Sequence, residues 1–209
     1  MKNQWSIGLL TAAALSCGAS ASISTYTSDI SQIGSETNYA DFNELVVEQS
    51  LLGYQEDGLQ VSSHRDYFSW DAPGLDGSEM YYANTGALEL IEISKVDGSD
   101  FNDMDMQLSS GWSPNGPGTM YLWMQVYSDG GLVAEFNLDV LTGDYVGLTG
   151  GGYDTVMIGS YVNAEIRDLH DAGQWNAIAI DNLRAGTVPA PGTLLIPALA
   201  AAGLRRRRA

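Results

Sequence analysis

Alternation of apolar and polar side chains recurs along this chain, and it limits the possible folds more than any other feature of the sequence. The clearest stretch runs from Leu132 to Val140, where the even-numbered residues are apolar and the odd-numbered ones are mostly polar. Successive side chains of a β-strand point to opposite faces of a sheet, so this pattern predicts a strand with one buried face. Phe101 to Leu108 alternates in the same way. There we expect one set of side chains inward and the other outward: Met104, Met106 and Leu108 against Asp103, Asp105 and Gln107.

Seven other stretches favour β-strands by alternation or by their content of β-branched and aromatic residues. They are Phe42 to Glu48, Leu59 to Ser63, Met80 to Ala83, Leu88 to Ser94, Tyr121 to Tyr127, Thr155 to Ser160 and Trp175 to Leu183. Turn residues separate them: Asp97-Gly98, Asp129-Gly130-Gly131, Gly143-Asp144 and Gly150-Gly151-Gly152. No stretch has a sustained helical period. Residues 22–187 are therefore predicted to form one all-β domain, an antiparallel β-sandwich of the jelly-roll type with about nine or ten strands.

The charge of the predicted domain excludes one class of partner. Residues 22–187 hold four basic residues against all 26 acidic ones, which gives a formal net charge of −22. Such a surface repels the phosphate backbone, so nucleic acid is not expected as a partner. Two interpretations of the charge stay open: solubility in a saline environment, or binding of divalent cations by some of the carboxylates.

The first 21 residues have the features of a secretory signal. Lys2 supplies the positive charge, an apolar stretch predicted as a helix follows, and Ala19-Ser20-Ala21 places small residues at the two positions that signal peptidase reads. We expect signal peptidase to cut after Ala21, so that Ser22 begins the mature chain. An alternative is lipidation at Cys17, the only cysteine of the sequence. A mature chain without cysteine forms no disulfide and carries no thiol chemistry.

The other end, residues 188–209, carries three features in order. A proline motif comes first, a short apolar stretch predicted as a helix follows, and an arginine cluster comes last. The motif residues are Val188, Pro189, Ala190 and Pro191, and the cluster is Arg205, Arg206, Arg207 and Arg208. The apolar stretch is too short for a helix that spans the roughly 30 Å hydrocarbon core, so a transient membrane hold is expected. A plain membrane anchor is the alternative.

This tail resembles the PEP-CTERM sorting signal of exported proteins of Gram-negative bacteria, with Ala190 at the place of the usual Glu. The resemblance implies an exosortase-type enzyme that cuts near Pro189 to Pro191. It also implies delivery to the cell envelope, the cell surface or the extracellular matrix.

The middle of the chain resembles jelly rolls of the galactose-binding and carbohydrate-binding-module type. Three segments carry the resemblance: Phe42-Asn43-Glu44-Leu45, Lys95 to Phe101, and Ala179-Ile180-Asp181-Asn182-Leu183. Related jelly rolls hold a structural calcium ion between their first and last strands. The resemblance therefore implies a calcium site with Glu44 and Asp181 as ligands.

The search for catalytic residues gives none. The nucleophile pattern Gly-x-Ser-x-Gly is absent, and His64 and His170 are expected in exposed loops. Four tryptophans of the domain could stack on a sugar ring, and Trp112 is the best candidate because its loop is rich in glycine and proline. We therefore expect an exported, non-enzymatic surface or matrix protein that binds exopolysaccharide. The alternative is a secreted carbohydrate-active enzyme.

Overall fold

The computed structural model of the chain describes most of the predicted domain. The described residues are 22–45, 53–63, 68–70, 79–83, 90–110, 118–169 and 175–187. The predicted signal sequence, with Ala19 and Ala21, and the predicted sorting tail at 188–209 lie outside them. Within the described ranges the one helix, α1 (Ala164–Asp168), has five residues, and no helix there is long and apolar enough to cross a bilayer.

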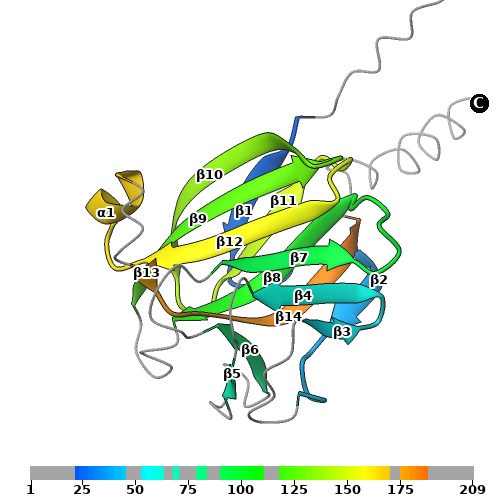
Figure 1. The fold of residues 1–209 in the computed structure, drawn as a ribbon, viewed down its shortest axis with the longest axis horizontal. Helices are drawn as coiled ribbons and strands as arrows, with labels where there is room; N and C mark the ends of the chain where they lie inside the picture. Colours follow the sequence, from blue (N-terminus) through cyan, green and yellow to red (C-terminus); the bar gives the residue numbers. More distant parts are fainter. Residues whose placement is uncertain are drawn as a thin grey trace, which may run out of the picture.

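Two antiparallel sheets face each other in this part of the chain and form a β-sandwich (Figure 1). In order, the path of sheet A is β1 (Ser24–Ser28), β11 (Tyr145–Thr149), β8 (Asp103–Ser110), β14 (Ile178–Thr187), β6 (Met80–Ala83) and β5 (Phe68–Trp70), and β2 (Ser35–Ala40) also pairs with β14. The path of sheet B is β10 (Gly131–Leu141), β9 (Thr119–Ser128), β12 (Thr155–Tyr161), β7 (Ile91–Lys95), β4 (Leu59–Ser63) and β3 (Tyr54–Glu56), and β13 (Trp175–Asn176) also pairs with β12.

The core lies between the two sheets and is built from the inward residues of each strand. In sheet B the inward residues of β9 are 0–1% exposed: Met120, Leu122, Met124 and Val126. In sheet A the inward residues of β8 are 0% exposed: Met104, Met106 and Leu108. These assignments confirm the facing that the alternation predicted for both strands. Their apolar area, removed from water, is the main stabilising contribution of such a sandwich.

The all-β sandwich is confirmed, and most of the predicted strands are present. Two have the predicted bounds, β4 and β6, and β7, β9, β10 and β12 differ by a few residues at their ends. The described residues form fourteen strands, which is more than the expected number. Five short ones were not predicted because they lack a clear alternation: β1, β2, β3, β5 and β11.

The prediction of a strand from Phe42 to Glu48 is wrong for its described part. Phe42 has a φ of 58°, which turns the chain away from an extended course. Leu45 then donates a backbone hydrogen bond to Phe42, which closes the turn. The reason is packing, because the buried Phe42 ring contacts the rings of Tyr54 and Tyr81.

Three local features also differ from the expectation. Leu132 is exposed although the alternation placed it inward, since a bulge shifts the register of β10 between Leu132 and Ala134. The alternation of β8 places Asp105 on the outer face of sheet A, yet its side chain is fully buried because residues 31 and 32 cover it. Helix α1 was not predicted because five residues are too few to give a period. Its start does carry a signal, Asn163, whose side chain accepts a hydrogen bond from the backbone N–H of Ile166.

Candidate sugar-binding face

The outward residues of sheet B form one continuous face, which we call the sheet B outer face. The register of the five strands from β10 to β4 defines it. Aromatic, amide, hydroxyl and carboxylate side chains dominate it: Tyr121, Trp123, Gln125 and Tyr127 of β9, Glu135, Asn137 and Asp139 of β10, Thr155 and Met157 of β12, Glu92 and Ser94 of β7, and Gln60 and Ser62 of β4. A surface with aromatic rings beside hydrogen-bonding groups is what a sugar ring needs, because sugars have apolar CH faces and polar edges.

Trp123 lies on β9, the strand next to the edge strand β10, and is half-buried. Its neighbour on β10 is Asn137, which is exposed. Its neighbour on β12 is Gly159. A glycine at this register position places no side chain of β12 beside the indole, while Asn137 offers an amide that both donates and accepts hydrogen bonds. The arrangement combines a stacking surface with a polar group one strand away.

A chain of hydrogen bonds fixes the polar side chains next to Trp123. The hydroxyl of Tyr127 donates to Gln125 Oε1 at 2.6 Å, and Gln125 Nε2 donates to Glu135 Oε2 at 2.7 Å. The chain links β9 to the edge strand β10. Side chains held in this way lose less rotamer freedom when a ligand binds, which favours recognition.

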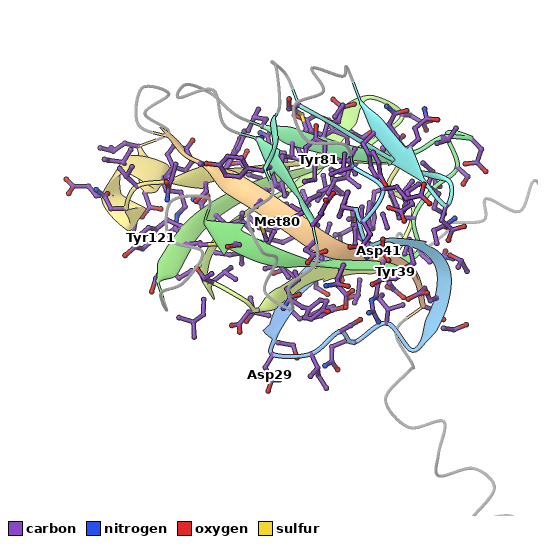
Figure 2. The ribbon with its side chains drawn as sticks, turned by 90° about the horizontal axis from the view of Figure 1, so that it is seen from below. Asp29, Tyr39, Asp41, Met80, Tyr81 and Tyr121 are labelled. Carbon is purple, nitrogen blue, oxygen red and sulfur yellow. The ribbon has the colours of Figure 1, made fainter. Side chains whose placement is uncertain are left out.

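Helix α1 closes one end of the face. In Figure 2 the labelled Tyr121 lies beside α1 at one end of the sandwich. Arg167 of α1 places its guanidinium 6.0 Å from the centre of the Tyr121 ring and donates to the Leu138 carbonyl oxygen at 2.9 Å. Arg167 also forms ion pairs with Asp139 and Asp168. The Tyr121 end is therefore occupied by the protein itself, and the part around Trp123 and Tyr127 is the candidate contact surface.

The environment of Arg167 keeps it charged. Burial lowers the pKa of its guanidinium, but the hydrogen bonds and charges of Asp139 and Asp168 outweigh burial and raise the pKa above its ordinary value. The cation is thus committed to neighbouring carboxylates.

The two described carboxylates that share one row of this face, Glu135 and Glu92, lie on strands far apart. Glu135, Gln125, Met157 and Glu92 occupy one row across β10, β9, β12 and β7. Three strand spacings separate the backbones of Glu135 and Glu92, which is about 14 Å. Glycosidases place their two carboxyl groups about 5–9.5 Å apart. Among the described residues, this face offers no pair at that distance along the row.

Two hollows occur elsewhere in the described part of the chain. One, of about 530 Å³, lies around Asn38, Lys95 and Asp97. The other, of about 560 Å³, lies around Ser22 and the turn Gly150 to Gly152. The described lining of each contains no histidine and at most one carboxylate, so neither is a candidate catalytic centre.

The residues predicted from the sequence fall at different places. Trp112, His64 and His170 lie outside the described residues, as do Val188, Pro189, Ala190, Pro191 and Arg205 to Arg208. Ser22 is exposed just before β1. The structure therefore leaves the Trp112 prediction untested and points instead to Trp123. The sequence contained the information that Trp123 faces outward. In the predicted strand 121–127, alternation places the aromatic residues on the face opposite to Leu122, Met124 and Val126.

The predicted calcium ligands lie on separate elements. Glu44 is exposed in the turn after β2, whereas Asp181 is fully buried in β14 and accepts a hydrogen bond from the N–H of Asn182 at 2.7 Å. No group of three or more His, Cys, Asp or Glu side chains within the described ranges is arranged to hold a metal ion. The calcium site stays a prediction, and thermal melting with chelator or with calcium at high salt would test it.

Comparisons with known proteins give little beyond this geometry. No protein-family model matches the chain, and no curated protein matches it at a significant level. Among solved structures, the chain is similar to the CBM22-1 xylan-binding domain from Paenibacillus barcinonensis Xyn10C, with 13% sequence identity and a TM-score of 0.39. The match covers 76% of this chain and 98% of that one. What this chain binds has to follow from its own residues.

Proposed function

We propose that residues 22–187 form a non-catalytic carbohydrate-binding domain, and that the sugar stacks on Trp123 of the sheet B outer face. The observation that carries the proposal is the position of Trp123. It stands on an interior strand of an outward face, between an exposed asparagine and a glycine. Tyr127, Gln125 and Glu135 supply hydrogen-bonding groups in the adjoining rows.

The enzyme alternative has less support. A glycosidase needs two carboxyl groups across the scissile bond, and the row that holds Glu92 and Glu135 spaces them too widely. An oligosaccharide binder needs no such pair. Release of reducing sugars from any bound polysaccharide would favour the enzyme instead.

Binding can be tested with an array of neutral polysaccharides, followed by calorimetry on a hexasaccharide that binds. Trp123→Ala should weaken binding at least tenfold, which corresponds to about 1.4 kcal/mol, because the stacking surface is lost. Trp123→Phe keeps an aromatic ring and should retain most of the affinity. Ile30→Ala is the matched control, since Ile30 is 62% exposed and lies in the segment after β1, a strand of the other sheet. Equal binding by Trp123→Ala and Ile30→Ala would remove the proposed site.

We further propose that the domain is exported and sorted by its two terminal segments. The bounds of the sandwich support this, because β1 begins at Ser24 and β14 ends at Thr187. A cut after Ala21 and a second cut between Pro189 and Pro191 would therefore leave every described strand whole. The proposed location is the cell envelope, the cell surface or the extracellular matrix, where exopolysaccharide is the ligand.

Mass spectrometry of protein from the native envelope tests the processing steps. The mature chain should begin at Ser22, and an acylated Cys17 would contradict that. Replacement of Arg205 to Arg208 should leave export intact and block the second cut. A tail that persists in unmodified cells would favour the plain membrane anchor.

A further inference from the structure

A hollow of about 530 Å³, lined by elements of both sheets, has no part in the proposed function. Sheet A contributes β2, and sheet B contributes the β3–β4 turn together with β7 and the residues that follow it. These elements lie together at the right-hand end of the sandwich in Figure 1. Strand β12 separates β7 from β9, and the described lining does not include Trp123. The volume is typical of small-molecule sites, which range from about 300 to 1,000 Å³.

Hydrogen bonds between the three elements hold the walls of this hollow. The side-chain amide of Asn38 donates to the Asp57 carbonyl oxygen at 2.7 Å, which ties β2 to the β3–β4 turn. The backbone N–H of Val96 donates to the Gly58 carbonyl oxygen at 2.9 Å, which ties the same turn to the residues after β7. A site whose walls are held before the ligand arrives loses less conformational freedom on binding.

The described lining contains one cation, Lys95, and one anion, Asp97. Lys95 Nζ donates to the Asp100 carbonyl oxygen at 2.7 Å, and no other described residue accepts a hydrogen bond from it. An ammonium group has three donors, so donors remain for a ligand. Asp97 Oδ1 accepts the N–H of Ser99 at 2.9 Å. Hydrogen bonds from Ser99 lower the pKa of Asp97, and the charge of Lys95 acts in the same direction, so the carboxylate stays an acceptor.

Neutral groups complete the lining and indicate the kind of ligand. Asn102 is exposed, and no described residue bonds its amide, which can donate and accept. Val96 is 51% exposed and offers an apolar surface. An acidic ligand would meet the Asp97 carboxylate and a metal ion would meet the Lys95 ammonium, so repulsion disfavours both. A neutral sugar matches the lining, because its hydroxyl groups donate and accept and its CH groups are apolar.

We propose that this hollow is a second carbohydrate site, which takes one neutral sugar residue through two adjacent hydroxyl groups. One hydroxyl donates to the Asp97 carboxylate and accepts from the Lys95 ammonium. The next hydroxyl bonds the Asn102 amide, and the CH groups of the ring contact Val96. The ligand class is that of the proposed function, but the site has its own residues and does not depend on stacking at Trp123.

The test follows the backbone amide NMR signals of Gly98 and Ser99 in the full chain during titration with the methyl β-glycosides of glucose, galactose and xylose. At least one glycoside should shift these signals with a millimolar Kd, because a single sugar makes few contacts. The 3-deoxy analogue of that glycoside has no two adjacent free hydroxyl groups and should bind about fivefold more weakly. Equal binding of the analogue would contradict the proposed recognition.

Three variants test the residues of the hollow. Asn102→Ala should weaken binding about fivefold, and Asp97→Asn about tenfold, because hydrogen bonds to charged groups are stronger. Asn102 is exposed, so its variant keeps the test valid if Asp97→Asn disturbs the turn. Asp129→Asn is the matched control, since Asp129 precedes Gly130 in the exposed turn between β9 and β10. If Asn102→Ala binds as Asp129→Asn does, the assignment of Asn102 is refuted.

The remaining outcomes separate this site from the one at Trp123. The shifts at Gly98 and Ser99 should persist in Trp123→Ala, and their loss would show that the hollow is no separate site. If no glycoside shifts these signals while polysaccharides bind through Trp123, the proposed function stands and the second site is wrong. If the glycosides bind here and Trp123→Ala leaves polysaccharide binding unchanged, the second site stands and the stacking site fails. Shifts caused by calcium chloride and by none of the glycosides would make the hollow a cation site and overturn the inference.

Discussion

Replacement of Asp105 should release the N-terminal segment from the outside of sheet A. One oxygen of this fully buried carboxylate, Oδ2, accepts three hydrogen bonds. The donors are the hydroxyl of Tyr26 at 2.9 Å, the hydroxyl of Ser31 at 2.8 Å and the N–H of Gln32 at 2.9 Å. All three come from β1 and the segment after it, where Asp29 is labelled in Figure 2. Asp105 thus ties this segment to the middle of sheet A.

The cost of Asp105→Ala can be worked out from these contacts. Each lost hydrogen bond contributes about 1 kcal/mol once the freed donor can reach water, which gives roughly 3 kcal/mol for the three. For a domain of this size, 1 kcal/mol lowers the melting temperature by about 2–4 °C, so a decrease of about 6–12 °C is expected. Burial and the charge of Asp105 raise the pKa of Tyr26 well above its ordinary range, so this donor keeps its proton in any usual buffer.

Thermal unfolding followed by circular dichroism measures the loss of stability. The experiment is done at about 0.5 M NaCl, because salt at this concentration screens the effect of removing one negative charge. Tyr26→Phe removes one of the three donors and should cost about 1 kcal/mol. Asp105→Asn keeps an oxygen acceptor and should fall between the two. If Asp105→Ala costs no more than Tyr26→Phe, the carboxylate does not hold the segment and the reasoning is wrong.

Three further changes test other parts of the structure. Burial raises the pKa of Glu56 despite the hydrogen bonds that it accepts. Just above pH 4.5 the folded protein therefore binds more protons than the unfolded chain. Its free energy of unfolding falls as the pH rises through that window. Glu56→Gln should remove this fall in urea unfolding measured across the window; a fall equal to that of the wild type would contradict the assignment. Gly147→Ala places a methyl group against the Tyr26 ring and should lower the free energy of unfolding by about 2 kcal/mol in the same assay. A neutral effect would show that the ring does not pack there. Arg167→Met removes the ion pair with Asp139. It should speed amide hydrogen exchange in α1, while the free energy of unfolding of the whole domain falls by no more than about 1 kcal/mol. An unchanged exchange rate would show that the pair does not hold the helix.

The sequence by itself determined the two sides of the central strands. Alternation places Leu122 and Met124 on one side of β9 and Trp123 on the other, because a half-buried strand must separate apolar from polar side chains whatever its partners are. Glycine-containing turns determined where several strands end. In β10 the same reasoning failed only at Leu132, where an extra residue in the bulge changes the facing.

Only the tertiary structure decided which residues meet. Asn137 and Gly159 become the neighbours of Trp123 through the register of β10 and β12 on β9, and alternation within one strand contains no information on the partner of that strand. The same holds for Asp105, which the sequence places on a polar face and which residues 31 and 32 then bury. Alternation records which side of a strand meets water locally, whereas pairing between distant segments minimises the free energy of the whole domain. That pairing created both the candidate sugar-binding face and the buried carboxylate.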